Sequence, residues 1–370
     1  MFIKNIRLKN YRNYKELNLN IDKRFNVIYG DNAQGKTNIL EAIYICSSGR
    51  SHRTSRDVEL VNHESKSYYI KIDVEKKILN SEIEVQYENE GKKKLRINEI
   101  PLKKIGDLMG NLNTVLFSPE DLLIIKEGPS ERRRFIDITI SQLKPSYFYD
   151  LQQYMKILDQ RNSLLKDIQN NRKLLDTLDV WNENIIKTGS RIMKTRKEFM
   201  DKLSKFAKTE HEKLTGGLET LNIRYNPSFP VNRFDDIKEI ENDYRKSLER
   251  NKEKEIFKCT TLIGPQRDDY EIFLDQKSLK MYGSQGQQRT AVLSVKMAEI
   301  DIMKEETGEW PVLLLDDVLS ELDSKRQEYL FENITGIQVF ITCTEKSFFS
   351  AKASERADFF KVTKGVVIKE

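Results

Sequence analysis

The sequence predicts an α/β fold in which both ends of the chain form one domain around a helical insertion. Strand-like alternation fills the first thirty residues, where Phe2, Ile6 and Leu8 share one face. Helical spacing of apolar residues begins near Pro145, and short buried strands return in the C-terminal third. We therefore expect a head made of residues 1–144 and 259–370, with an inserted helical arm made of residues 145–258.

The N-terminal region is predicted to be a mixed sheet that leads into a loop and a helix. Residues 25–29 have the composition of a buried strand that runs into a glycine, and residues 38–45 have helical composition. Alternation at 68–74 and 83–87 predicts an antiparallel patch, with the polar residues 89–94 as its hairpin turn.

The arm is predicted to contain a first helix over residues 151–165 and a second, longer helix marked by a repeating stripe. Its apolar positions recur every seven residues: Leu178, Ile185, Ile192, Phe199 and Phe206. A protruding helical hairpin and a long amphipathic helix packed on an ordinary core both need this stripe, and we favour the protruding arm. A charged helix follows over 237–258, and later strands at 312–315 and 338–342 enclose a helix at 324–332.

Composition excludes several classes of protein. Lys and Arg total 63 against 58 Asp and Glu, and a net charge of +5 does not by itself indicate a nucleic-acid partner. The longest apolar runs are far shorter than the roughly 18 residues of a membrane span, so no membrane association is expected. Three scattered cysteines and an N-terminus without an apolar signal segment favour a reducing cytoplasm. The three histidines have no close Cys or His neighbours in the sequence, which excludes a zinc site of adjacent residues.

The strongest local motif follows the strand at 25–29 and matches the Walker A pattern G-x-x-x-x-G-K-[ST]. Glycines in such a loop let backbone N–H groups surround phosphates, the lysine reaches the β- and γ-phosphates, and the last hydroxyl binds Mg²⁺. The motif predicts binding of ATP with Mg²⁺ by Gly30, Asp31, Asn32, Ala33, Gln34, Gly35, Lys36 and Thr37.

An acidic pair ends the buried strand at 312–315, as expected of a Walker B motif. Asp316 is expected to hold Mg²⁺ together with Thr37, and Asp317 to orient or deprotonate the attacking water. Because Lys36 and Asp316 must contact one nucleotide, the two chain ends must fold together around the insertion.

A third motif, residues 283–289, precedes a helical stretch and offers an anion-binding helix N-terminus. It resembles the signature motif of ABC-type ATPases, which binds the γ-phosphate held by a second subunit. This resemblance implies catalytic roles for Lys36, Asp316, Asp317 and Ser284, with further nucleotide contacts from Gly286 and Gln287. Residues 319–323 resemble the D-loop of the same superfamily, although an ordinary helix cap has the same pattern.

A split ABC-type P-loop head with a helical insertion resembles the chromosome-maintenance ATPases, and motifs along the whole chain resemble the RecF family of bacterial recombination mediators. These motifs are Leu8–Tyr14, Gly49–Arg53, Phe117–Leu122, Gly128–Asp137 and Gly264–Asp269, beside the three above. The resemblance implies a cytoplasmic, nucleoid-associated protein that forms an ATP-dependent homodimer and binds single-stranded DNA, gapped DNA and duplex junctions. It also implies cooperation with RecR and RecO to load RecA in DNA repair, replication-fork maintenance and SOS induction.

Candidate DNA contacts lie just after the Walker A helix. Arg50, His52, Arg53 and Arg56 stand among serines and threonines, a mixture suited to DNA phosphates. Residues 92–94 (Lys-Lys-Lys) are a second candidate at the predicted hairpin tip, where a solvated surface is the simpler interpretation. Residues 132–134 (Arg-Arg-Arg) either bind DNA or serve a structural role between head and arm.

The expected activity is slow, DNA-stimulated ATP hydrolysis that acts mainly as a conformational switch. The superfamily usually has Glu after the Walker B aspartate, and Asp317 is one methylene shorter. The superfamily also usually has a histidine after the last core strand, and here that histidine is absent. Thr342 and Thr344 lie there instead, on either side of Cys343. One alternative is a nuclease on the same head, which requires a further metal-binding carboxylate cluster. Another is a non-hydrolysing scaffold, against which the intact motif residues speak.

Overall fold

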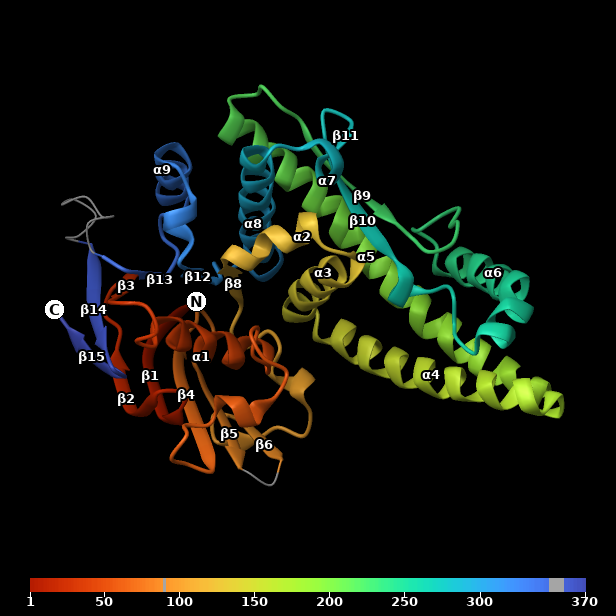
Figure 1. Cartoon of the computed structure of the whole chain (residues 1–370), viewed down its shortest axis with the longest axis horizontal. Coiled ribbons are helices and arrows are strands. Elements are labelled where there is room, and N and C mark those ends of the chain that lie inside the picture. The colour runs from red at the N-terminus through yellow and green to blue at the C-terminus, as the bar shows by residue number, and fades with distance from the viewer. Residues whose placement is uncertain (89–90, 346–355) are drawn as a thin grey trace. The chain divides into compact units, whose positions relative to one another are not determined.

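The computed structural model describes residues 1–88, 91–345 and 356–370, which divide into two compact units. The first unit contains Met1–Leu122 and Lys296–Glu370, and the second contains Leu123–Val295 (Figure 1). The predicted arm, residues 145–258, lies within the second unit, and the proposed limits of the head stay a prediction.

A six-stranded sheet in the first unit is built from both ends of the chain, in the order β15-β14-β3-β13-β12-β8. Its strands are β3 (Phe25–Tyr29), β8 (Thr114–Phe117), β12 (Val312–Asp316), β13 (Val339–Cys343), β14 (Ala357–Thr363) and β15 (Val366–Lys369). All neighbours are parallel except β14 and β15. β12 and β13 are buried at every position. Parallel strands that are covered on both faces need nearly continuous apolar sequences, which these two strands have. The expected union of the two chain ends is confirmed.

A second, antiparallel sheet of the first unit has the order β2-β1-β4-β5-β6-β7. It contains β1 (Phe2–Tyr11), β2 (Tyr14–Asn20), β4 (Ser67–Glu75), β5 (Ser81–Glu88), β6 (Lys92–Ile97) and β7 (Ile100–Pro101). The prediction of one mixed N-terminal sheet is wrong, because β3, whose three central residues are buried, joins the parallel sheet instead. Residues 92–94, predicted to lie in the hairpin turn, belong to β6 instead, and residues 89–90 lie outside the described residues.

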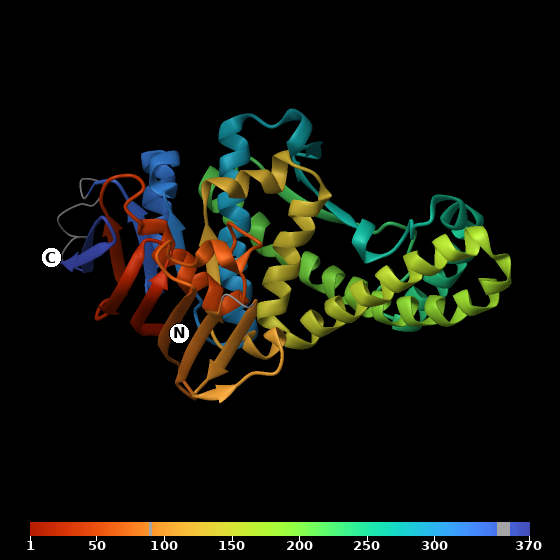
Figure 2. The same ribbon diagram turned by 60° about the horizontal axis from the view of Figure 1, so that its bottom comes forward.

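Helix α1 (Lys36–Ser48) contacts β4 and β5 of the antiparallel sheet and β8, β12 and β13 of the parallel sheet. Figure 2 shows α1 on one face of the antiparallel sheet. A helix covered on two sides must be apolar on most of its surface, and 11 of the 13 residues of α1 are buried. The other elements of this unit are η1 (Asp57–Leu60), η2 (Ile105–Leu108), η3 (Pro119–Leu122), η6 (Val318–Glu321) and α9 (Ser324–Asn333).

The second unit combines helices with a three-stranded sheet of order β11-β10-β9. Its helices are α2 (Leu123–Lys126), α3 (Pro129–Leu143), α4 (Pro145–Asn170), η4 (Arg172–Thr177), α5 (Leu178–Thr215), α6 (Ile237–Lys258), η5 (Pro265–Arg267) and α7 (Leu279–Tyr282). Its strands are β9 (Leu221–Asn226), β10 (Asp269–Leu274) and β11 (Lys277–Ser278).

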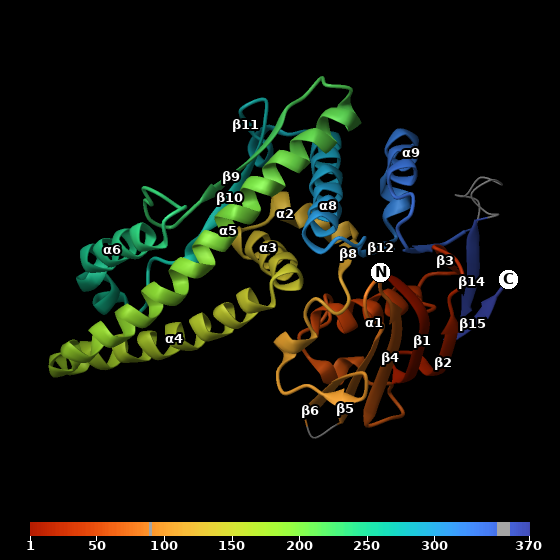
Figure 3. The same ribbon diagram turned by 180° about the vertical axis from the view of Figure 1, so that it is seen from behind.

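The predicted seven-residue stripe lies on α5, which has 38 residues and a length of about 57 Å. This helix packs against α4, α6 and β9, and Figure 3 shows it flanked by α4 and α6. Stripe residues Ile185, Ile192 and Phe199 are buried. The apolar stripe therefore packs into a core that includes a strand of the three-stranded sheet. This is how an amphipathic helix packs, and it differs from a two-helix coiled coil.

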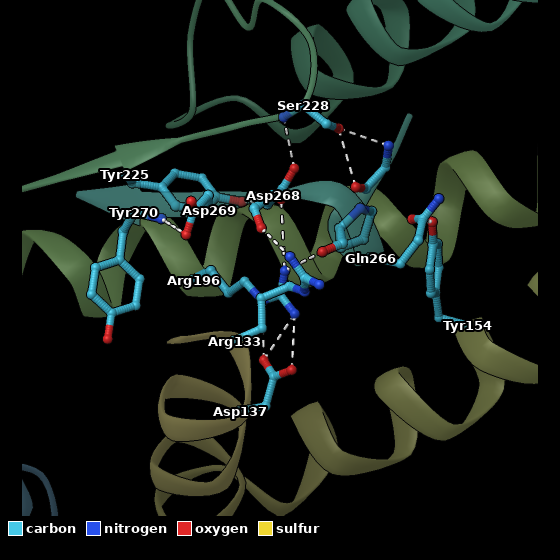
Figure 4. A network of polar contacts seen from close by, with 12 residues as sticks. Arg133, Asp137, Tyr154, Arg196, Tyr225, Ser228, Gln266, Asp268, Asp269 and Tyr270 are labelled. Carbon is cyan, nitrogen blue, oxygen red and sulfur yellow. Dashed lines mark hydrogen bonds and ion pairs between the residues drawn. The ribbon is translucent and has the colours of Figure 1, made fainter. Parts of the chain in front are cut away.

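A buried polar network connects α5 with α3 and η5 in the second unit (Figure 4). Arg196 is 2% exposed and donates two hydrogen bonds to Asp137, at 3.0 and 2.9 Å. Its third nitrogen donates to the carbonyl of Pro265 at 2.6 Å, while Asp268 accepts from Tyr225. The network gives Pro265 and Asp268, in the motif at 264–269, a structural role.

Helix α8 (Gln285–Thr307) begins in the second unit and continues into the first. The helices predicted at 237–258 and 324–332 and the strands predicted at 312–315 and 338–342 are confirmed to within one residue at each end. No helix in the described part of the chain is long and apolar enough to span a membrane.

Candidate nucleotide-binding site

The Walker A loop, residues 30–35, connects β3 to α1. Two turns contact it, one between β1 and β2 and the other between β14 and β15. Gly35 has a φ of 111°, and a Cβ there would lie 2.3 Å from Nδ2 of Asn13, so only glycine fits. The Asn13 amide donates to the carbonyl of Gln34 at 2.6 Å, and the backbone N–H of Lys364 donates to Oε1 of Gln34 at 2.6 Å. These contacts fix the backbone that would surround a phosphate, and the sequence motif did not reveal them.

Lys36 is the first residue of α1 and turns back over the loop. Its side chain is buried, and its ammonium donates to the carbonyls of Gly30 at 2.6 Å and Asp31 at 2.9 Å. The positive charge therefore lies on the loop that would hold the phosphates, as the motif predicts.

Thr37, Asp316 and Thr342 meet at the carboxyl ends of neighbouring strands. Thr37 Oγ1 donates to Asp316 Oδ1 at 2.8 Å, and Thr342 Oγ1 donates to the same oxygen at 2.7 Å. Burial raises the pKa of Asp316 above its ordinary value, although the hydrogen bonds from the two threonines act against burial. Hydroxyl and carboxylate oxygens this close fit Mg²⁺, which takes few protein ligands and completes its shell with phosphates and water. Thr37 and Asp316 would hold the ion.

Asp317 follows β12 in a left-handed conformation with a φ of 56°, which aspartate tolerates better than most residues. Its backbone N–H donates to Thr342 Oγ1 at 2.9 Å. Thr342 therefore anchors both residues of the acidic pair. Sequence reasoning gave this threonine only a phosphate-orienting role, because the pairing of β13 with β12 is needed to see the contact.

A buried carboxylate on α1 organises the segment that follows the helix. Glu41 is fully buried and accepts from Arg12 at 2.9 and 2.7 Å and from Ser51 at 2.5 Å. Burial alone would raise the pKa of Glu41, but the hydrogen bonds from Arg12 and Ser51 outweigh it and hold the pKa below its ordinary value. Neither Arg12 nor Glu41 was assigned a role from the sequence.

The four predicted DNA contacts occupy this segment but differ in their surroundings. Arg50 and Arg56 are exposed. Arg53 donates to Asn38 Oδ1 at 3.0 Å and lies 3.7 Å from Glu41, so it faces α1. His52 packs edge-on against Tyr44, with ring centroids 5.1 Å apart.

The other candidate cations whose side chains the structure describes make contacts within the protein. Lys93 contacts Asp57 at 2.6 Å, and Lys94 contacts Glu88 at 2.9 Å, while the side chain of Lys92 lies outside the described part. Arg132 pairs with Asp269. Arg133 donates to the carbonyl of Asp268, which favours the structural interpretation of the 132–134 run.

The predicted signature residues begin α8 in the second unit, where Ser284 and Gly286 are exposed. The backbone N–H of Ser284 donates to Gln287 Oε1 at 2.8 Å, and the backbone N–H of Gln287 donates to Ser284 Oγ at 3.2 Å. This reciprocal pair is a capping box that shapes the first turn. In the D-loop-like segment, Asp323 caps α9 by accepting from the backbone N–H of Arg326.

The family model of the RecF/RecN/SMC N-terminal domain matches residues 2–367. A relative in Acetivibrio thermocellus, named DNA replication and repair protein RecF, is 58% identical over 349 residues, which cover 94% of this chain and 95% of the relative. The chain belongs to the RecF family. A second RecF of the same description, from Ruminiclostridium cellulolyticum, is 53% identical and covers 99% of this chain and 98% of its own length.

Solved structures agree with this assignment to the RecF family. A structure described as the recombination mediator protein RecF with ATP, in the RecFOR pathway, superposes with a TM-score of 0.93 at 39% identity and covers 100% of this chain and 97% of its own. An Smc head domain from Pyrococcus furiosus has a TM-score of 0.55 at 16% identity, covers 100% of this chain and 96% of its own, and shows the fold alone. The predicted ABC-type ATPase head, related to chromosome-maintenance ATPases, is confirmed.

Proposed function

We propose that the chain is an ATP-gated DNA-binding recombination mediator in which two copies pair around bound ATP. The observation that carries this proposal is the contact of Thr37 and Thr342 with Asp316, which joins both nucleotide motifs at one edge of the sheet. The known ATP complex of a RecF relative adds support.

The nucleotide contacts follow from the Walker A geometry. Backbone N–H groups of the loop, Gly30 to Gly35, surround the phosphates, and the Lys36 ammonium leaves its two carbonyl partners to pair with phosphate oxygens. Mg²⁺, held by Thr37 and Asp316, would neutralise charge on the phosphates. Asp317 orients the attacking water, and its short side chain makes hydrolysis slow, so that ATP acts mainly as a switch.

Pairing of two copies uses the start of α8. Ser284 Oγ already accepts from the N–H of Gln287, so its own O–H remains able to donate. We infer that this hydroxyl, the exposed Gly286 and Gln287 recognise the γ-phosphate held by the partner copy. A helix N-terminus favours an anion at this position.

DNA binding is assigned to Arg50, Arg53 and Arg56, with His52 as their packed neighbour. Arg53 donates to Asn38, the residue after Thr37 on α1, so a phosphate that draws Arg53 away from Asn38 changes the contacts of the helix that carries Thr37. This coupling would let DNA stimulate hydrolysis. The substrates we expect are single-stranded, gapped and junction DNA.

The wider role follows from the RecF family. We propose that the protein acts in the cytoplasm at the nucleoid, with RecR and RecO, so that RecA loads onto gapped DNA during repair, replication-fork maintenance and SOS induction. A nuclease on the same head needs a further metal-binding cluster, and the described ranges group no three His, Cys, Asp or Glu side chains in a way that could hold a metal. No specific observation favours that alternative.

The proposal is tested by sedimentation with ATP, ADP or no nucleotide, with and without gapped duplex. We expect wild type to dimerise only with ATP, and Lys36→Ala and Ser284→Arg to stay monomeric and bind DNA more weakly. Ser163→Arg, at an exposed serine of α4, is the matched control and should behave as wild type. An unchanged mass of wild type in every condition would overturn the proposal. Persistent ATP-dependent dimers of Lys36→Ala would instead indicate a scaffold that does not use this site.

A further inference from the structure

A line of hydrogen bonds connects the start of α8 with the end of α5 inside the second unit. Gln287 Nε2 donates to Glu219 Oε1 at 2.8 Å. The other oxygen of Glu219 lies 3.3 Å from His211 Nε2, and His211 Nδ1 lies 3.0 Å from Ser294 Oγ. Glu219 belongs to the turn between α5 and β9, so three separate segments meet at the signature motif.

Glu219 decides which way the amide of Gln287 points. A carboxylate accepts hydrogen bonds and cannot donate them, so Gln287 must present its NH₂ group to Glu219. The amide oxygen then faces the backbone N–H of Ser284, at 2.8 Å. In the reverse orientation two acceptors would meet at Glu219 and two donors at Ser284. The carboxylate thus maintains the capping box of the signature motif.

His211 holds Glu219 from the opposite side. Its side chain is fully buried, and burial lowers its pKa below the ordinary value, against the hydrogen bond to Glu219, which raises it. A neutral imidazole has one N–H, which on Nε2 donates to Glu219. Nδ1 then lies beside the Ser294 hydroxyl, which itself donates to the carbonyl of Thr290 at 2.8 Å. Ser294 lies on α8 itself, so the line begins and ends on the helix that it positions.

We propose that Glu219, supported by His211, is a positioning residue for the signature motif, which it presets for a phosphate carried by a second copy of the chain. The first turn of a helix has N–H groups without intrahelical partners and frays unless it is capped. A turn that is already ordered loses less conformational freedom when a ligand arrives. The inference rests on the proposed function, because it assumes that the signature motif meets the nucleotide of a partner.

The first test compares two binding constants for Glu219→Ala. Titration with a fluorescent ATP analogue at protein concentrations below dimerisation measures ATP affinity of the single copy, and sedimentation measures the dimer dissociation constant at saturating ATP. Loss of a charge-assisted hydrogen bond at each signature motif should raise the dimer constant by about 10- to 100-fold. ATP affinity of the single copy should stay unchanged, since the Walker motifs lie in the other unit.

Two further variants separate hydrogen bonding from charge. Glu219→Gln keeps an acceptor for Gln287, and its NH₂ group can donate to His211 in the alternative tautomer, so we expect near wild-type dimerisation. Glu212→Ala removes the same charge from a half-exposed residue next to His211 and should have no effect. Dimerisation of Glu219→Ala equal to wild type, or a defect of Glu219→Gln equal to that of Glu219→Ala, would overturn the inference.

A swap of the two side chains keeps the test decisive if Glu219→Ala does not fold. Gln287→Glu places two carboxylates together and should abolish dimerisation, whereas Gln287→Glu combined with Glu219→Gln restores a donor between them and should recover it in part. No recovery would contradict the positioning role. If wild type itself does not dimerise with ATP, the proposed function fails first; if only the Glu219 variants behave as wild type, this inference alone fails.

Discussion

Thr37 and Asp316 lie 279 positions apart in the chain, yet the hydroxyl of Thr37 donates a 2.8 Å hydrogen bond to Asp316 Oδ1. The parallel sheet creates this contact by placing β3 and β12 on either side of β13. The proposed magnesium ligands therefore come together only when both ends of the chain have folded together.

Asp316→Asn should stabilise the nucleotide-free protein while it abolishes Mg²⁺-dependent ATP binding. Burial raises the pKa of Asp316, so ionisation of this carboxyl destabilises the fold. The neutral carboxyl contributes stability that is complete below the ordinary pKa of 3.8 and is lost as the pH rises through the raised pKa. We expect a gain of roughly 1 kcal/mol in the free energy of unfolding at pH 7. Urea unfolding and ATP titration with and without Mg²⁺ measure the two effects, and a less stable variant would contradict this account.

Glu41→Gln should destabilise the first unit by about 3 kcal/mol, because it leaves the Arg12 guanidinium beside a neutral group. The pKa of Glu41 is held low, so its stabilisation is present above the ordinary pKa of 4.5 and is lost as the pH falls through the depressed value. Urea unfolding between pH 7 and pH 3 should show a weaker acid dependence in the variant. Glu64→Gln, which breaks the exposed pair with Lys15, is the control and should leave the free energy of unfolding nearly unchanged.

Arg53→Ala should weaken DNA binding and reduce its salt dependence. Each lost phosphate contact lowers the slope of log K against log salt by about 0.9 for duplex DNA. Lys94→Ala removes the same charge from a half-exposed lysine that is paired with Glu88 and should leave the slope unchanged. Equal slopes for wild type and Arg53→Ala would show that Arg53 does not contact DNA phosphates.

Arg196→Met should destabilise the second unit more than Arg191→Met does. The substitution leaves the Asp137 and Asp268 carboxylates without their shared cation, which costs about 3–5 kcal/mol for a buried pair. Arg191→Met, at a half-exposed pair with Asp150, should cost no more than about 1 kcal/mol. Thermal unfolding followed by circular dichroism separates the two variants.

The sequence predicted the features that depend on local pattern. The Walker A loop, the buried strand that ends at Asp316 and the helix at 237–258 each follow from composition and spacing within one short segment. The family resemblance also came from such segments.

Contacts between distant segments were not predictable in this way. The role of Thr342 depends on the register of β13 beside β12, and that of Glu219 depends on a turn that returns to α8. The assignment of β3 to the parallel sheet depends on its pairing with β13 and β14, which lie far away in the sequence. None of these relationships leaves a periodic signal in the sequence.

Each nucleotide is proposed to lie between Lys36 of one copy and Ser284 of the other, and a mixture of two inactive variants tests this arrangement. Lys36→Ala and Ser284→Arg are each expected to remain monomeric with ATP. Their mixture can form one composite site from the intact Lys36 of one copy and the intact Ser284 of the other. We predict that sedimentation of the mixture shows ATP-dependent heterodimers with partial ATPase activity, and a mixture that behaves as the sum of two monomers would contradict the account.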